Sequence, residues 1–428
     1  MPTLSQDLKF RGLVHQVSDP ELLPMLDRGE LSAYAGFDPS APSLHVGNLL
    51  GILTLRRLQE AGNRSILLAG GGTGLVGDPG GRSDERSQLS KDEVASNVEA
   101  VRSQLGRFLD LSGGPGRPAA LLLDNSAWLA SVGYLDFLRD VGKRFTVNQM
   151  VAKESVKSRL DRPDQGISYT EFSYMLLQAY DFLHLYDELG CRLQLGGSDQ
   201  WGNITMGIEL IRKSRGAEAY ALTWPLLLRA DGSKYGKSVE GAVWLDPQMS
   251  SPYGLYQSFI RVPDDIVGAQ LRQLTFLSHD EIGELDEETS ERPERRAAQR
   301  ALARAVCVLV HGEAETARAE RAARSLFSEE IAALDATLLA EVLADAPSTA
   351  IAHSELDGSG ADLLEVLVRT GLVASKSAAR TVLDQGGVYV SNRRRLPDQA
   401  RLTGDDVLAG AYVVLRRGQK DYHVLCLA

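Results

Sequence analysis

The sequence has few cysteines and no long apolar run. Its 428 residues include three cysteines, Cys191, Cys307 and Cys426, which are too scattered for a metal-ligand motif or a disulfide framework. The longest purely apolar runs, such as residues 66–69, are far too short to span a bilayer. The first seven residues have no basic start and no apolar core, so they predict no export signal. These absences favour a protein of the reducing cytoplasm with no membrane segment.

Basic charge is also scarce, because 57 acidic residues outnumber 46 basic ones and give a net charge of −11. Taken as a sum, that balance argues against nucleic acid as a partner. Its distribution is uneven, however, since residues 361–428 carry a net of +3 and the preceding 360 residues carry −14. An acidic body with a basic tail could contact RNA locally. A chance fluctuation over 68 residues would give the same numbers.

The chain is long enough for two to four domains. Short β-like runs alternate with helical patterns up to about residue 225. The strand candidates are 65–69, 121–123 and 193–195, and the helical stretches include 94–111 and 170–189. This alternation predicts an α/β domain with a Rossmann-like parallel sheet, which we place at residues 1–251.

Strand signals vanish after about residue 251. Residues 278–326 are rich in Ala, Arg and Glu at helical spacing, which predicts a helical domain over 252–335. Clusters of Pro, Ser and Gly then predict a linker over 336–360. A small α+β module is expected over 361–428. Its predicted elements are two helices and three strands, at 361–369, 375–384, 388–390, 412–415 and 423–427.

Two short motifs have the chemistry to handle phosphates. His45-Val46-Gly47-Asn48 opens an apolar helical run at 49–58, and the start of a helix attracts anions. Lys234-Tyr235-Gly236-Lys237-Ser238 places two lysines three residues apart on a glycine-containing loop, which could neutralise a polyphosphate. Taken singly, each motif is more often an ordinary helix start or a solvated turn.

A third motif, Gly72-Thr73-Gly74-Leu75-Val76-Gly77, matches the dinucleotide-binding fingerprint G-x-G-x-x-G. Asp78-Pro79-Gly80-Gly81 follows at once, so we expect no helix where that fingerprint needs one. A glycine-rich wall beside a small polar ligand is the alternative that we favour.

The helix predicted at 170–189 carries Tyr174, Gln178 and Asp181 on one face, among apolar neighbours. Buried Asp and Gln side chains are costly without partners, and a ligand with an ammonium and a hydroxyl would supply them. The alternative is that this face meets solvent.

These segments resemble the tyrosyl-tRNA synthetase family of class I aminoacyl-tRNA synthetases, in order and spacing, from about Arg11 to the C-terminus. The first and second phosphate motifs resemble degenerate copies of the HIGH and KMSKS signatures. The further matching blocks are Tyr34-Ala35-Gly36-Phe37-Asp38-Pro39, Gly77-Asp78-Pro79, residues 166–174, Leu177-Gln178-Ala179-Tyr180-Asp181 and residues 196–203.

The resemblance implies sites for L-tyrosine and ATP. Tyr34 and Asp181 would bind the phenolic OH, and the rest of the tyrosine site would be Asp78, Tyr174, Gln178, Gln200, Thr73 and Asn125. The implied nucleotide residues are Gly36, Asp38, Gly47, Gly197 and Asp199, with His45, Asn48, Ser40, Lys234, Lys237, Arg82 and Arg86 at the phosphates. Ala35 and Gly51 replace residues that touch the ribose in some members, so the ribose contacts differ here.

The implied reaction joins tyrosine to the α-phosphate of ATP, brought with Mg²⁺, and then transfers tyrosine to tRNA-Tyr. No tightly bound cofactor and no resident metal site are expected. Rejection of phenylalanine through the phenolic OH is known of this family.

The C-terminal module resembles a small RNA-binding domain shared by a ribosomal small-subunit protein and many pseudouridine synthases. The residues implied to contact tRNA are Lys376, Arg380, Arg393, Arg394 and Arg395 in this module, and Lys153, Lys157, Arg212 and Lys213 near the acceptor stem. Residues 137–160 match the insertion through which family members form homodimers.

Three alternatives stay open. A tryptophanyl enzyme would share the fold, although Tyr34 and Asp181 suit a phenol better than an indole N–H. A class I-type nucleotidyltransferase for a small acid would not need the basic tail. A non-enzymatic RNA-binding protein would have no need to retain His45, Lys234 and Lys237.

Overall fold

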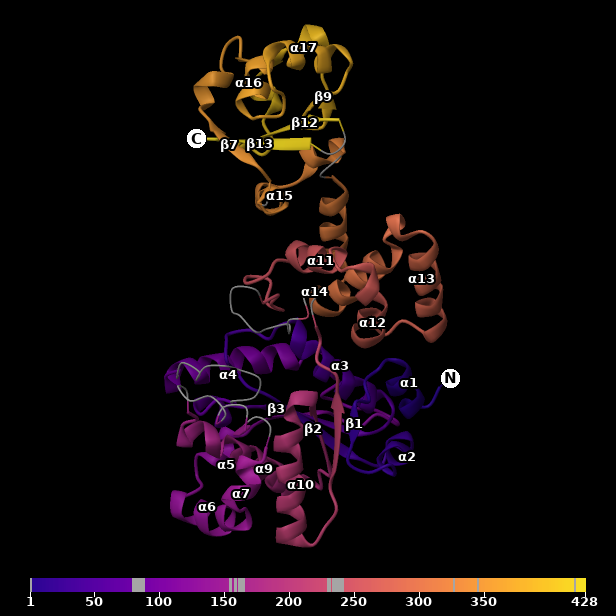
Figure 1. The fold of residues 1–428 in the computed structure, drawn as a ribbon, viewed down its shortest axis with the longest axis vertical. Helices are drawn as coiled ribbons and strands as arrows, with labels where there is room; N and C mark the ends of the chain where they lie inside the picture. Colours follow the sequence, from indigo (N-terminus) through magenta and orange to yellow (C-terminus); the bar gives the residue numbers. More distant parts are fainter. Residues whose placement is uncertain are drawn as a thin grey trace. The chain divides into compact units, whose positions relative to one another are not determined.

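The computed structural model describes residues 2–78, 89–153, 156–157, 160, 166–228, 232, 242–325, 328–344, 346–418 and 421–428 (Figure 1). The chain forms two compact units. The first comprises Met1–Ser250 and Phe259–Leu309, and the second Ser251–Ser258 and Val310–Ala428. Within the described ranges, no helix has both the length and the apolar character that a membrane span requires.

A mixed sheet organises the first unit. Its strands, in spatial order, are β1 (Gln16–Val17), β6 (Tyr220–Trp224), β5 (Leu193–Gly197), β2 (Ser32–Phe37), β3 (Arg64–Ala69) and β4 (Leu121–Asp124). Among the described strands of this sheet, only β1 and β6 pair antiparallel, and the other pairings are parallel. The predicted α/β fold with a parallel sheet is therefore confirmed, as are the three predicted strands.

Helices cover this sheet on both faces, so β3 is apolar almost throughout, without polar alternation. The helices of the first unit are α1 (Leu4–Phe10), α2 (Leu22–Asp27), α3 (Val46–Glu60), α4 (Lys91–Leu105), α5 (Ser126–Leu129), α6 (Tyr134–Asp140), α7 (Val147–Val151), α9 (Tyr169–Leu189), α10 (Trp201–Arg215), α12 (Asp264–Leu274) and α13 (His279–Glu291). Ser168 caps the start of α9, and Gly190 ends it with a φ of 62°, a conformation that glycine adopts readily.

The order of the strands creates a switch point between β2 and β5. From β2 the chain continues through α3 to β3 on one side, whereas from β5 it continues through α10 to β6 on the other. In open α/β sheets, ligands bind outside the carboxyl ends of the strands at such a point. The fold therefore places a site beside Phe37 and Gly197.

The glycine-rich segment after β3 starts with a short 3₁₀ turn at Thr73–Leu75 rather than an α-helix. This agrees with the expectation that the G-x-G-x-x-G match is not a dinucleotide fingerprint. Pro79, Gly80 and Gly81, on which that expectation also rested, lie outside the described residues.

The second unit contains a five-stranded sheet ordered β10 (Arg393–Arg394), β9 (Val388–Val390), β12 (Tyr412–Arg417), β13 (Asp421–Leu427) and β7 (Ser348–Ile351). A two-stranded sheet pairs β11 (Arg401–Leu402) with β8 (Ala361–Asp362). Its helices are α15 (Ala336–Leu343), α16 (Leu363–Arg369) and α17 (Lys376–Asp384), while α11 (Pro252–Ile260) and α14 (Ala297–Ser325) each contribute to both units.

Residues 336–360, expected as a linker, differ from that expectation. They contain α15 and β7, and β7 pairs in parallel with β13. Because β7 is an edge strand with exposed positions, its Ser-Thr-Ala-Ile sequence has little apolar character and reads as a linker. The predicted domain boundaries remain predictions, although α12 and α13 belong to the first unit rather than to a separate helical body.

Candidate active site

A cavity of about 300 Å³ opens at the switch point between β2 and β5. Its walls come from the ends of these strands, the start of α3, the glycine-rich turn after β3 and one face of α9. The predicted residues that line it are Tyr34, Gly36, Asp38, His45, Gly47, Asn48, Thr73, Asp78, Asn125, Tyr174, Gln178, Asp181, Gly197, Asp199 and Gln200. The structure therefore brings both predicted substrate sites into one cavity.

Five other predicted residues are not placed in this lining. Ser40 is exposed, and its backbone N–H donates to the carbonyl of Asp38 at 2.9 Å. Arg82, Arg86, Lys234 and Lys237 lie outside the described residues.

Asp181 on α9 is a buried carboxylate in the cavity and is 2 % exposed. Its two carboxylate oxygens accept hydrogen bonds from Asn125 Nδ2 at 2.8 Å and Trp128 Nε1 at 2.7 Å. Burial raises the pKa of Asp181 to about 7, although these two bonds favour the charged form. Both oxygens are thus held in place, with lone pairs left over for a further donor.

Tyr34 on β2 lies in the same cavity and is 1 % exposed. Burial, and secondarily the charge of Asp181, raises the pKa of its phenol well above the usual range, so the hydroxyl stays neutral. Among the described residues, the buried Tyr34 Oη has no hydrogen-bond partner. Because an unpaired buried hydroxyl is costly, this atom points to a ligand group that can donate or accept.

A chain of hydrogen bonds links this end of the cavity to Asp38, just beyond β2. Asn125 Nδ2 donates to Thr73 Oγ1, and Thr73 Oγ1 donates to Asp38 Oδ1, each at 3.0 Å. Tyr174 Oη donates to the other oxygen, Asp38 Oδ2, also at 3.0 Å. Three chain segments far apart in sequence are therefore fixed around one carboxylate.

An amide cluster surrounds a second carboxylate, Asp78. Gln200 Nε2 donates to Asp78 Oδ2 at 2.6 Å, and Asn203 Nδ2 donates to Gln178 Oε1 at 3.1 Å. With Asp38, Asp181 and Asp199, Asp78 gives the cavity four carboxylates. Such a lining suits a ligand that carries a cationic group.

The start of α3 forms the opposite wall. His45 is its N-cap residue, and the His45 backbone N–H donates to Asn48 Oδ1 at 3.0 Å. The partial positive charge of a helix start favours an anion here. The motif thus lies at a helix start, as expected, and its role at the phosphates stays a prediction.

The segments on either side of the lysine motif also reach this wall. Before it, Leu226 and Leu227 line the cavity. After it, the Val243 carbonyl accepts from the Val46 N–H at 2.9 Å, and the Leu245 N–H donates to the Leu44 carbonyl at 2.8 Å. The two phosphate motifs, far apart in sequence, are therefore joined through their neighbours.

The predicted RNA-contacting residues are mostly at the surface. In the first unit, Lys157 is exposed, Arg212 and Lys213 pair with Glu209, and Lys153 Nζ donates to Thr205 Oγ1 at 2.9 Å. In the second unit, Arg380, Arg393 and Arg394 are exposed and Lys376 pairs with Glu365. Arg395 differs from expectation, because it is partly buried in an ion pair with Asp406.

Among the residues of the site that were not predicted, three have polar groups that bear on its chemistry. Trp128 holds Asp181, Asn203 joins the amide cluster, and the buried Gln194 lines the cavity with an Oε1 that has no partner among the described residues. Gln194 carried a signal, since it is a polar residue between two leucines of a predicted strand. Asn203 lies one turn after Gln200 on the same helical stretch, which also hinted at a shared face.

The known proteins most informative for this chain share its whole length. A family model described as tRNA synthetases class I (W and Y) matches residues 26–328, and one described as the tyrosine–tRNA ligase SYY-like C-terminal domain matches residues 339–425. A tyrosine–tRNA ligase from Roseiflexus castenholzii is 51% identical over 427 residues, which cover 100% of both chains. The chain belongs to the tyrosine–tRNA ligase family. A further relative of that name, from Bacillus caldotenax, is 48% identical over 99% of each chain.

Solved structures agree with this family. A C-terminally truncated mitochondrial tyrosyl-tRNA synthetase from Aspergillus nidulans has a TM-score of 0.68 and 32% identity, covering 76% of this chain and 95% of the other. A tryptophanyl-tRNA synthetase from Plasmodium falciparum has a TM-score of 0.55 at 14% identity, covering 78% of this chain and 87% of the other. The second likeness is one of fold alone. The class I fold is thus common to both enzymes, and the high identity to tyrosine–tRNA ligases decides the family.

Proposed function

We propose that this member of the tyrosine–tRNA ligase family activates L-tyrosine with ATP to tyrosyl-adenylate and pyrophosphate, and then transfers tyrosine to the 3′ end of tRNA-Tyr. The observation that carries the choice of amino acid is the buried pair of Tyr34 and Asp181 in the cavity. The Tyr34 hydroxyl has no partner among the described residues, and Asp181 keeps spare lone pairs. A substrate phenol would donate to Asp181 and meet Tyr34.

This pair also supports discrimination against phenylalanine. Without a phenolic OH, the buried Tyr34 hydroxyl would gain no partner, at a cost of about 1–3 kcal/mol, and Asp181 would keep only its bonds from Asn125 and Trp128. An indole N–H could donate to Asp181, but it could not accept from Tyr34. Tyrosine is the aromatic amino acid that satisfies both.

The remaining tyrosine contacts follow from the carboxylates. Asp78, with Tyr174 and Gln178, is proposed to hold the α-ammonium, and Gln200 to lie by the carboxylate, while Thr73 and Asn125 fix the surrounding network. The ATP side is proposed to use Gly36, Asp38, Gly47, Gly197 and Asp199 for the nucleoside, and His45, Asn48, Ser40, Arg82, Arg86, Lys234 and Lys237 for the phosphates.

In the proposed chemical step, an oxygen of the tyrosine carboxylate attacks the α-phosphate in line. The bond from that phosphorus to the bridging oxygen breaks, and pyrophosphate leaves with the electron pair. The attacking carboxylate is already ionised, so no general base is needed, and the protein contributes positioning and charge stabilisation. Mg²⁺ enters as part of the substrate, bound to the ATP phosphates.

Transfer requires tRNA, and the exposed basic residues of both units are proposed to contact its phosphates.

A homodimer is also proposed, because large apolar side chains are exposed around residues 134–169. Among them, Leu135 is 78 % exposed and Val147 is 64 % exposed. Leu135→Asp should then convert a sedimenting dimer to a monomer, whereas an unchanged sedimentation coefficient would place the interface elsewhere. A cytoplasmic location is proposed in keeping with the free cysteines.

The direct test is amino-acid-dependent ATP–pyrophosphate exchange with tyrosine, tryptophan and phenylalanine in parallel. Exchange with tyrosine alone is expected. Exchange with tryptophan would retain the mechanism but overturn the roles of Tyr34 and Asp181. No exchange with any of the three would point to an RNA-binding protein on a synthetase scaffold.

A further inference from the structure

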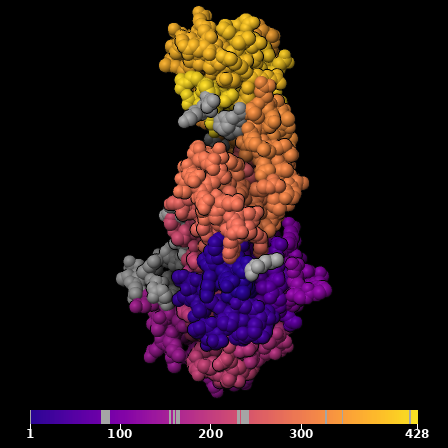
Figure 2. All heavy atoms as spheres, turned by 90° about the vertical axis from the view of Figure 1, so that its right-hand side faces the viewer, coloured from indigo at the N-terminus to yellow at the C-terminus, as the bar shows by residue number. Residues whose placement is uncertain are grey.

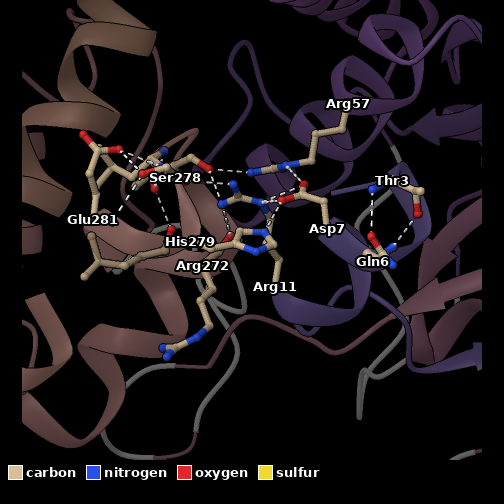
Figure 3. Close-up of polar contacts among 12 residues, drawn as sticks. Thr3, Gln6, Asp7, Arg11, Arg57, Arg272, Ser278, His279 and Glu281 are labelled. Carbon is tan, nitrogen blue, oxygen red and sulfur yellow. Dashed lines mark hydrogen bonds and ion pairs between the residues drawn. The ribbon is translucent and has the colours of Figure 1, made fainter. Parts of the chain in front are cut away.

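A group of charged residues, two of them buried and two partly buried, lies at the C-terminal half of α3, away from the cavity. It consists of Asp7 on α1, Arg11 just after α1, Arg57 on α3 and His279 on α13 (Figure 3). The N-terminal segment and α13 meet at this position, and both reach the surface of the first unit (Figure 2). None of these four residues belongs to the cavity lining.

Arg57 is the most enclosed member, at 4 % exposed. Its Nη2 donates to the Thr275 carbonyl at 2.5 Å, its Nε lies 3.7 Å from Asp7 Oδ2, and its guanidinium carbon lies 4.5 Å from the centre of the Phe276 ring. Burial lowers the pKa of Arg57 to about 9. Burying a cation in this way costs several kcal/mol before its contacts are counted, and an apolar residue of similar volume often stabilises a fold as well. A purely structural advantage is therefore a weak explanation for Arg57.

Arg11 binds the same turn. Its Nη1 donates to the carbonyls of Arg272 at 3.1 Å and Thr275 at 3.0 Å, and its Nη2 donates to Leu277 at 2.8 Å. The last carbonyls of a helix lack partners within the helix and carry partial negative charge. Arg11 and Arg57 therefore cap the C-terminal end of α12 with two guanidinium groups.

Asp7 lies beside the guanidinium groups of both Arg11 and Arg57. It accepts from Arg11 Nε at 2.9 Å and lies 2.8 Å from His279 Nε2. Burial alone would raise the pKa of Asp7, but the hydrogen bonds from Arg11 and His279 outweigh it and hold that pKa below its usual value. Asp7 is thus an anion among the cations that fix α12.

α12 also reaches the segment that leads to the lysine motif. Gln270 on α12 is buried, and its Nε2 donates to the Leu228 carbonyl at 3.5 Å. Leu228 directly follows Leu226 and Leu227 of the cavity lining. A single helix is therefore hydrogen-bonded to α3 at its C-terminal end and to the other nucleotide-side segment along its length.

We propose that Arg57 is a positioning residue for the ATP side of the reaction, acting through α12. α3 is a continuous helix, so a contact at Arg57 sets the position of His45, Gly47 and Asn48 roughly 18 Å away. Together, the contact of Arg57 with Thr275 and that of Gln270 with Leu228 fix the position of residues 226–228 relative to the start of α3. This inference rests on the proposed function, because it assigns a role to the ATP side of that site.

The test compares two adjacent arginines of α3. Arg57→Met removes the bond to Thr275 and keeps the apolar volume. Arg56→Met is the matched control, since Arg56 also lies over the Phe276 ring, at 4.7 Å, but is partly exposed and pairs with Glu60. For each variant, KM for ATP, KM for tyrosine and kcat are measured in ATP–pyrophosphate exchange, and ATP binding without tyrosine is measured by equilibrium dialysis.

A displacement of the helix start should raise KM for ATP or lower kcat by about tenfold to a hundredfold in Arg57→Met. KM for tyrosine should change less than about twofold, which also verifies that the variant is folded. Arg56→Met should match the wild-type protein in all three constants. Unchanged ATP parameters in Arg57→Met, or equal losses on the ATP and tyrosine sides, would overturn the proposal.

A second variant, Gln270→Leu, tests the proposal independently in case Arg57→Met does not fold. Gln270→Leu leaves the charged group intact and removes the bond to Leu228, so it should reproduce the ATP-side defect without the tyrosine-side one. A normal KM for ATP and a normal kcat in this variant would overturn the role of α12. ATP binding in the dialysis experiment does not need tyrosine activation. A loss of ATP binding in Arg57→Met therefore tests this proposal even if the wild-type protein does not catalyse exchange with tyrosine.

Discussion

At the scale of single residues, the site depends on how buried polar atoms are paired. Asp181 has two protein donors, Asn125 and Trp128, while the buried Tyr34 hydroxyl has none among the described residues. The family resemblance predicted Tyr34, Asp181 and Asn125. It did not predict Trp128, because the indole reaches Asp181 from a helix 53 positions earlier, and no local sequence pattern encodes that contact.

Removal of the Asp181 carboxylate should abolish tyrosine activation. Asp181→Ala takes away the acceptor proposed for the phenol and leaves Asn125 and Trp128 without their partner. ATP–pyrophosphate exchange with tyrosine is the measurement. Asp187→Ala is the control, since Asp187 lies on the same helix but is exposed and pairs with Arg215. Retained exchange in Asp181→Ala would contradict the assignment of the phenol site.

The raised pKa of Asp181 also predicts a dependence of stability on pH. Its value of about 7 exceeds the ordinary value of 3.8, so the folded chain binds the proton more tightly than the unfolded chain. The stabilising contribution is fully present below about pH 4 and is lost as pH rises through 7.

Asp181→Asn removes this titration. The free energy of unfolding of the wild-type protein, relative to Asp181→Asn, should therefore fall between pH 5 and pH 8. Chemical denaturation at several pH values measures this difference. A difference that stays constant, or that grows as pH rises, would show that the carboxylate is stabilised by its partners more than it is penalised by burial.

At the scale of elements, sequence periodicity predicted α3, α4, α9, β3, β4 and β5, and it missed β2, β6 and β7. β2 reads Ser-Ala-Tyr-Ala-Gly-Phe and β6 reads Tyr-Ala-Leu-Thr-Trp. Both are short and buried from both sides, so neither shows polar alternation or a dense run of β-branched residues. α4 ends at Leu105, earlier than expected, where Gly106 follows.

The turn after β3 is a second element with a measurable role. A Cβ at Gly70 would come within 2.6 Å of Thr73 Oγ1 and closer still to Asp38 Oδ1. Gly70→Ala should therefore break the Thr73–Asp38 hydrogen bond, lower the exchange rate and cost about 1–3 kcal/mol of stability. Gly283→Ala is the control, because a Cβ at Gly283 on α13 meets nothing within 4 Å. Wild-type exchange by Gly70→Ala would show that the turn can shift freely.

At the scale of the whole molecule, the basic tail predicted from charge is part of a larger folded unit. Leu339 and Val342 of α15 pack with Val414 and Val424 of the C-terminal sheet. Charge counting could not reveal this, since α15 and β7 lie in the acidic part of the chain before residue 361. The place at which the chain can be cut therefore differs from the sequence-based boundary.

Two truncated chains test this organisation. A chain that ends at Ser325 should retain tyrosine-dependent exchange but charge tRNA poorly, because it lacks the proposed RNA-contacting residues of the second unit. A chain that ends at Gly360 keeps α15 and β7 without their partners, so it should aggregate more and melt at lower temperature. Light scattering, thermal melting, exchange and tRNA charging are the measurements. If the chain that ends at Ser325 charged tRNA as well as the full chain, the second unit would not be needed for tRNA charging, and the proposed organisation would be wrong.

The position of β13 has a consequence for how the protein is made. Among the described strands, β13 comes last along the chain, and it lies in the sheet between β12 and β7. By contrast, the last described strand in the sheet of the first unit, β6, ends at Trp224. During synthesis, the cavity of the first unit, which is lined by residues 34–227, can therefore assemble while the chain is still growing. The C-terminal sheet must wait until residues 421–427 have been made, and a ribosome that stops before them releases a protein without the strand between β12 and β7.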